Sequence, residues 1–145
     1  MVKLVICVLV VAAMMTDVAG GACENSTVDT SPAFGPARAA KAKAFLVELR
    51  HAVKQDDRKK VASMVRYPLT VSGGKRRTIR TRAQFVSGYA GIITGAVKQS
   101  VLNQDPECLF GNDRGAMIGR GSVWFEERPA GFAIFAINLS AGDAK

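Results

Sequence analysis

A chain of 145 residues is long enough for one domain with its own hydrophobic core. Its 20 Lys and Arg residues against 12 Asp and Glu give a net charge of +8, which favours anionic partners. Nucleic acid is not expected, because no aromatic residue lies among the clustered arginines to stack on bases. The sequence has no Cys-x-x-Cys pair or Cys/His cluster, so we predict neither a metal nor another cofactor.

The first residues resemble a secretory signal peptide. A short basic start precedes the apolar run LVICVLVVAAMM, which suits a signal and is short for a membrane span. Val18 and Gly20 fit the −3 and −1 positions of a cleavage site before Gly21, which predicts a signal peptide over 1–20. A retained anchor and a lipoprotein modified at Cys23 are the alternatives. We therefore expect a periplasmic or secreted protein with no transmembrane segment after cleavage.

Residues 21–37 are rich in Gly, Ser, Thr and Pro without periodicity, which predicts a flexible leader before a single domain over 38–145. Phe45, Leu49 and Val53 then recur at helical spacing and predict an amphipathic helix. A second, shorter helix follows, with Asp56 or Asp57 as its N-cap and an apolar face of Val61, Met64 and Val65.

A hairpin and a third helical region come next. The residue before proline is pushed out of the α region, so the second helix should end at Tyr67 and a strand should begin at Pro68. The Gly-Gly pair after this strand is typical of a two-residue hairpin turn. Thr81 and Gln84 have the spacing of a capping box, which marks a helix start, and Thr94 predicts the start of a further helical segment.

Three runs typical of strands close the chain, around Cys108–Phe110, over Ala116–Glu126 and over Phe132–Leu139. The predicted order is α-α-β-β-α-β-β-β, ending in an antiparallel meander. Strands and helices do not alternate regularly, so the fold class is α+β rather than a parallel sheet. We expect the N-terminal helices to pack on a strongly curved, cone-like antiparallel sheet.

The stretch RGAMIGRGSVWF holds three glycines and the only tryptophan of the chain. In one continuous strand, Gly115, Gly119 and Gly121 would all lie on the same face. Glycines inside a strand mark a bend or a close approach of backbone, which predicts a bent strand with a concave side. A phosphate-binding loop is the alternative, but the G-x-G-x-x-G spacing is absent and no helix is predicted to follow.

The Tyr67-Pro68-Leu69 start of the hairpin and the runs LFGNDRGAMIGRGSVWF and AIFAIN resemble small secreted bacterial members of the nuclear transport factor 2-like superfamily. The resemblance covers about residues 39–139. It implies a curved sheet around a long helix, a pocket inside the cone and often a homodimer through the sheet. It does not imply one activity, because this fold hosts both enzymes and binding proteins.

Enzymes of that superfamily usually place a carboxylate or a histidine in the pocket as an acid or base. Here the predicted strands carry no carboxylate except Glu126 and Glu127 at an outer end, which puts such chemistry in doubt. The weak catalytic candidates are His51 with Glu48 on the first helix, and Asp113. The residues that could line a ligand pocket or an interface are Tyr67, Tyr89, Arg120, Trp124 and Asn138.

Two further features bear on partners. Cys23 and Cys108 would remain after signal cleavage and could pair in an oxidising compartment. A cluster of cations forms a candidate polyanion patch, made of Arg58, Lys59, Lys60, Lys75, Arg76, Arg77, Arg80 and Arg82. We predict an exported, non-catalytic module that binds a small molecule or an envelope protein, as an inhibitor or immunity protein would. The alternative is a small pocket enzyme of the isomerase, dehydratase or hydrolase kind using His51 or Asp113.

Overall fold

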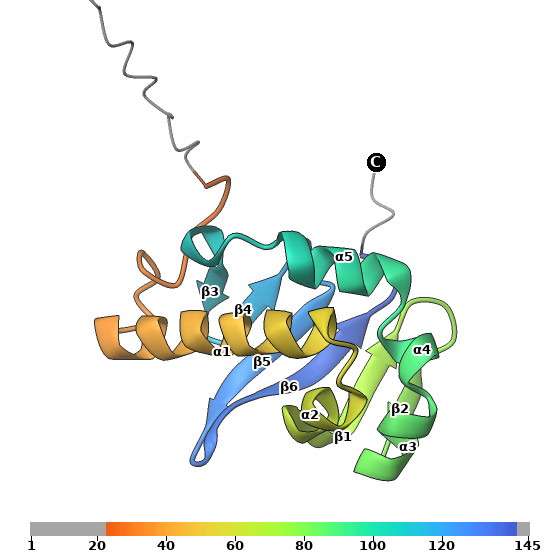
Figure 1. Cartoon of the computed structure of the whole chain (residues 1–145). Helices are drawn as coiled ribbons and strands as arrows, with labels where there is room; N and C mark the ends of the chain where they lie inside the picture. Colours follow the sequence, from red (N-terminus) through yellow and green to blue (C-terminus); the bar gives the residue numbers. More distant parts are fainter. Residues whose placement is uncertain (1–22, 142–145) are drawn as a thin grey trace, which may run out of the picture.

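The computed structural model describes residues 23–141 (Figure 1), so the predicted signal peptide lies outside the described residues. Helices lie on one face of a six-stranded sheet, which confirms the α+β class. In chain order the elements are α1 (Pro36–Lys54), α2 (Arg58–Ser63), β1 (Val65–Ser72), β2 (Arg77–Ile79), α3 (Arg82–Ser87), α4 (Tyr89–Ile92), α5 (Gly95–Asn103), the short 3-10 helix η1 (Pro106–Cys108), β3 (Phe110–Asn112), β4 (Gly115–Ile118), β5 (Val123–Arg128) and β6 (Gly131–Asn138).

The sheet has the strand order β2-β1-β6-β5-β4-β3 and is mixed, which corrects the expected antiparallel sheet. Strands β1 and β6 pair in parallel, and all other neighbours are antiparallel. The prediction was wrong because β1 and β6 are far apart in sequence. A meander pairs only strands that follow one another along the chain, so it does not predict this parallel pair. The same pairing moves the start of β1 back to Val65, ahead of Pro68, because the Ile134 amide donates to the Met64 carbonyl at 2.9 Å.

Helix α1 crosses the sheet and supplies more buried residues to the core than any other described helix (Figure 1). The Phe45 and Phe125 rings lie 4.7 Å apart between α1 and β5, where both side chains are buried. The predicted helix caps are confirmed: Asp57 accepts from the Lys60 amide at 3.0 Å, and Thr81 accepts from the Gln84 amide at 3.2 Å. Within residues 23–141, no helix is long and apolar enough to cross a membrane.

The glycine-rich stretch is a hairpin and not the bent strand that the sequence predicts. Strands β4 and β5 pair antiparallel on either side of a turn over residues 119–122. Gly119 and Gly121 have φ angles of 62° and 99°, which suit glycine in a turn and would strain other residues. Because the chain reverses, Met117 pairs with Trp124, and both point away from the helices while Phe125 is buried.

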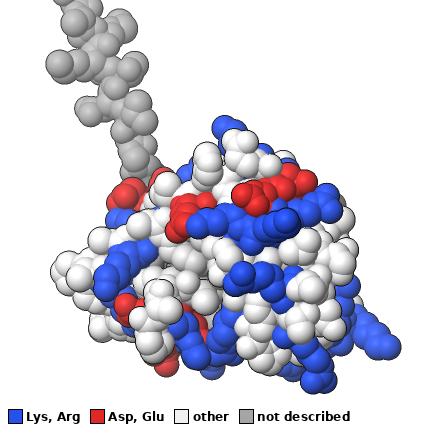
Figure 2. Space-filling model, turned by 60° about the horizontal axis from the view of Figure 1, so that its bottom comes forward, with Lys and Arg blue, Asp and Glu red and all other residues white. Residues whose placement is uncertain are grey.

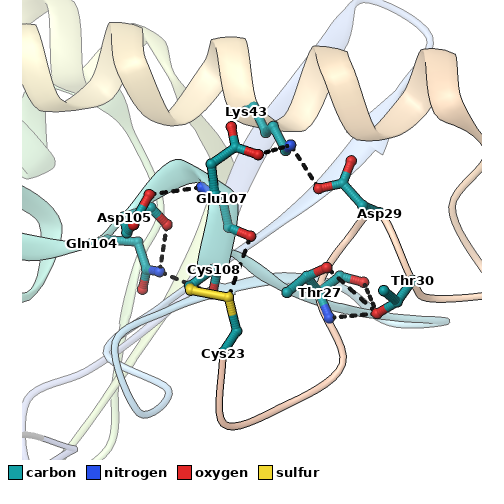
Figure 3. The surroundings of a disulfide bond; sticks show 9 residues. All are labelled: Cys23, Thr27, Asp29, Thr30, Lys43, Gln104, Asp105, Glu107 and Cys108. Carbon is teal, nitrogen blue, oxygen red and sulfur yellow. Dashed lines mark hydrogen bonds and ion pairs between the residues drawn. A yellow bond between two sulfur atoms is a disulfide. The ribbon is translucent and has the colours of Figure 1, made fainter. Parts of the chain in front are cut away.

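Residues 23–35, expected to belong to a flexible leader, instead pack along the β3 edge and are called the N-terminal strap here. Val28 and Phe34 of the strap are buried in the core, and Thr27 forms a β-bridge with Phe110. A disulfide joins Cys23 to Cys108, 85 residues away (Figure 3). These contacts join segments that are distant in sequence, which is why a local composition rule predicted a mobile segment.

Candidate functional site

The helices cover one face of the sheet, and the other face carries a groove of about 450 Å³. Its floor is a row of side chains in register across neighbouring strands: Met117 of β4 pairs with Trp124 of β5, which pairs with Ala136 of β6. Phe135 also lines the groove. These residues are only partly buried, because no helix covers this face. A floor of this kind can bury a flat apolar group.

Trp124 is held between two aromatic rings on the open face. Its ring lies 6.2 Å from that of Phe110 in an edge-to-face arrangement and 6.5 Å from that of Phe135. Each neighbour comes from a different strand, so the sheet itself fixes the indole orientation. The groove therefore presents a positioned aromatic surface rather than a mobile one.

Polar groups surround this apolar floor. Arg114 comes from the β3–β4 turn, where its amide donates to the Asn112 side chain at 2.9 Å, and Arg120 comes from the β4–β5 turn. Asn138 lies at the end of β6 and accepts from the Ser140 amide at 3.1 Å through its side-chain oxygen. None of the described residues that line the groove is acidic. The Arg114 guanidinium is exposed at this groove, and its positive charge favours an anion there.

The structure brings together three of the five predicted pocket residues, Arg120, Trp124 and Asn138. Their role in binding stays a prediction. The other two, Tyr67 and Tyr89, lie elsewhere and do not line this groove. They pack against Phe85 on the helical side of the sheet, with ring centroids 6.5 Å and 5.9 Å from it.

Burial explains the state of both tyrosines. The Tyr67 hydroxyl donates to the Ala62 carbonyl at 2.9 Å, and burial raises the pKa of Tyr67 to about 12. Burial also raises the pKa of Tyr89 from its ordinary value. Its hydroxyl is buried and has no hydrogen-bond partner among the described residues. Both side chains act as packing groups and stay protonated at neutral pH.

The three catalytic candidates do not form one site. Glu48 forms an ion pair with Lys60 rather than orienting His51. His51 is exposed on α1 and lines a separate hollow of about 360 Å³, with Arg50 among its neighbours. Asp113 is exposed in the β3–β4 turn. Across residues 23–141, no group of three or more His, Cys, Asp or Glu side chains could hold a metal ion.

The groove also contains residues that the sequence reasoning did not single out, namely Arg114, Met117 and Phe135. A hairpin interpretation of the glycine stretch would have found Met117, because it places that residue opposite Trp124. Phe135 had no clear local signal, because it lies in a register shift between Ile134 and Ala136 that breaks the alternation along FAIFAIN. Arg114 had no local signal, because a turn residue joins a groove only through the fold.

The cations of the predicted polyanion patch divide into two groups. Arg58 pairs with Asp56 at 3.4 Å, Lys60 pairs with Glu48, and Arg77 donates to the Gly91 carbonyl. The other five are exposed and form no ion pair with any residue in 23–141: Lys59, Lys75, Arg76, Arg80 and Arg82.

Comparisons with models of known protein families, with curated proteins and with solved structures give no match for this chain.

Proposed function

We propose that the protein is a non-catalytic binding module and that the groove on the open sheet face is its ligand site. The carrying observation is the composition of that groove: an aromatic and methionine floor beside the exposed Arg114, with no acidic side chain among the described residues that line it. This combination suits a small molecule that has a flat apolar part and an anionic group. A volume of about 450 Å³ lies in the range of small-molecule sites and fits one or two fused rings.

The two parts of the groove contribute differently to binding. Trp124 and Phe135 provide apolar surface, and each 100 Å² of ligand buried there contributes about 2.5 kcal/mol. The guanidinium of Arg114 can donate two hydrogen bonds in parallel to a carboxylate, sulfonate or phosphate, which sets orientation. A ligand with only one of these features would therefore bind much more weakly than one with both.

The proposal includes export to the periplasm or the exterior. The Cys23–Cys108 disulfide supports this, because such bonds persist in oxidising compartments and are rare in the cytosol. The predicted cleavage before Gly21 would leave both cysteines in the mature chain. Sequencing the N-terminus of protein recovered from the cell envelope or medium tests this part, and a chain that retains residues 1–20 contradicts it.

Membership of the nuclear transport factor 2-like superfamily belongs to the same proposal. A helix of 19 residues packed on one face of a six-stranded sheet supports it. The resemblance also implies a homodimer, and an envelope protein is the alternative partner for the open face. Native mass spectrometry of protein purified gently and without reductant separates these outcomes, because a ligand, a second copy and a protein partner each add a distinct mass.

Fluorescence provides the sharper test, because Trp124 is the only tryptophan of the chain and lies in the groove. We would titrate the protein with 1-anilinonaphthalene-8-sulfonate, which joins fused rings to an anionic sulfonate. Saturable quenching of Trp124 is expected. Arg114→Gln should weaken binding about tenfold, because a charge-assisted contact is lost.

Arg50→Gln is the matched control, since it makes the same chemical change in the separate hollow on α1. It should leave the affinity within about twofold of the parent. Absence of saturable quenching, or an equal loss in both variants, would refute the groove as the ligand site. A ligand mass in the native spectrum that survives Arg114→Gln would point to a different pocket.

A further inference from the structure

The charges of the chain are distributed very unevenly. Between Arg58 and Gln104 the sequence holds ten Lys or Arg residues and no Asp or Glu. Half of the 20 cations of the chain thus lie in one segment that carries no neutralising charge of its own. This segment includes α2, the β1–β2 hairpin and α3, so these elements carry the excess positive charge.

Carboxylates from other segments neutralise part of this charge. Asp56, Glu48 and Glu126 pair with Arg58, Lys60 and Arg66, respectively. Five exposed cations keep no ion pair among the described residues: Lys59, Lys75, Arg76, Arg80 and Arg82. Lys59 and Arg82 line one hollow and, with the neighbouring Arg80, are called the basic end. Figure 2 brings the side of the molecule with α2 and α3 forward and shows more blue than red side chains on it.

The basic end is more than a charged surface, because it contains an apolar hollow. Lys59 of α2 and Arg82 of α3 line this hollow of about 640 Å³, and Ala83 and Val86 of α3 form its apolar part. Lys59, Arg82 and Ala83 are exposed, while Val86 is half-buried. Cations beside an apolar recess match the two layers of a membrane surface, where anionic phosphates lie above the glycerol and acyl region.

We propose that the basic end docks onto a membrane surface that contains anionic phospholipid. Lys59 and Arg82 contact headgroup phosphates, and the hollow between them takes the apolar part of a lipid. The apolar recess favours lipid over a soluble polyanion, because a hydrophilic polymer gains nothing from Ala83 and Val86. This inference goes beyond the ligand groove, since the two sites share no lining residue.

Co-sedimentation with vesicles tests the proposal. The probes are vesicles of phosphatidylcholine alone and vesicles in which about 30 % of the lipid is phosphatidylglycerol, with the salt concentration varied. The protein should sediment with the anionic vesicles only, and rising salt should reduce the bound fraction. Each basic residue near an anionic surface contributes about fivefold to the partition coefficient, so Lys59→Glu with Arg82→Glu should lower it at least about tenfold.

Lys98→Glu is the matched control for Lys59→Glu, because it makes the same charge change on α5, outside the hollow. It should reduce binding less than about threefold, through net charge alone. Circular dichroism verifies folding, and the salt titration of the unmodified protein is informative even if a variant does not fold. Equal binding to both vesicle types, or equal losses in the two variants, would overturn the proposal. Binding of long-chain polyphosphate without binding of anionic vesicles would also overturn it and assign the basic end to a soluble polyanion.

Discussion

At the N-terminal strap, Lys43 lies between two carboxylates, whereas at the basic end Lys59 and Arg82 are exposed with no ion pair among the described residues. The Lys43 ammonium is 2.6 Å from Asp29 and 2.8 Å from Glu107 (Figure 3). Those two hydrogen bonds, the one to Asp29 contributing more, raise the pKa of Lys43. A basic side chain thus joins three segments at the N-terminal strap, whereas basic side chains at the basic end leave the surface positively charged.

The difference separates charge that stabilises the fold from charge that can attract a partner. Lys43 joins the strap, α1 and η1, next to the disulfide, so its charge is already neutralised within the molecule. The cations of the basic end repel one another and join no segments in this way. Changes at the strap should therefore alter stability, and changes at the basic end should alter binding.

Removing the disulfide should have the largest effect on stability. Cys23→Ser with Cys108→Ser frees a loop of 85 residues, and loop entropy predicts a loss of about 4 kcal/mol in the free energy of unfolding. Urea denaturation of the oxidised protein and of the double variant measures the loss. Binding to anionic vesicles should stay unchanged while the variant is folded. A loss below about 1 kcal/mol would show that strap contacts hold without the crosslink.

Filling the space under the strap should have the next largest effect. A Cβ atom at Gly111 would lie 2.7 Å from a methyl group of Val28 and 3.0 Å from the Phe34 ring, so Gly111→Ala must push the strap away. Such overpacking costs about 2 kcal/mol. Gly95→Ala is the control, because nothing lies within 4 Å of its added Cβ. If both variants melt at the same temperature, the strap does not pack on β3 as described.

The strap also shows what the sequence could not predict about the fold. The first helix and the Asp57 and Thr81 caps follow from local spacing, and the structure confirms them. The position of the strap depends instead on Cys108 and Phe110, which are distant in sequence. The parallel pairing of β1 with β6 was missed for the same reason. Local patterns predict elements, and long-range pairing decides where they lie.

The candidate groove was predicted in part. Arg120, Trp124 and Asn138 line one groove, and their role in binding stays a prediction. Met117 was missed because one continuous strand does not place it opposite Trp124, and Arg114 was missed because a turn residue gives no local signal. Once the chain reverses over residues 119–122, every residue before the turn changes its partners across the sheet.

Removing the charge of Lys43 should lower stability less than loss of the disulfide or Gly111→Ala does. Lys43→Met should lower the free energy of unfolding by about 1 kcal/mol at neutral pH, because the Asp29 and Glu107 side chains are 47 % and 74 % exposed and water screens both pairs. The pKa of Lys43 is raised in the folded protein, so its contribution is complete below about pH 10.5 and is lost as the pH rises further. The difference in unfolding free energy between parent and variant should stay constant from neutral pH and shrink only as the pH passes about 10.5, which a series from pH 7 to 11.5 measures. A difference that stays constant across that whole range would contradict an ionic contribution.

Removing the charges of Lys59 and Arg82 should have the smallest effect on stability, and it tests directly whether these cations differ from Lys43. Lys59→Gln with Arg82→Gln should change the free energy of unfolding by no more than about 0.5 kcal/mol, because neither side chain has an ion pair among the described residues to lose. Any change should be a gain that shrinks as salt is added, since relieved repulsion is screened. Urea denaturation at low and high salt measures both. A clear loss of stability would mean that Lys59 and Arg82 stabilise the fold as Lys43 does, which would contradict the contrast between the two regions.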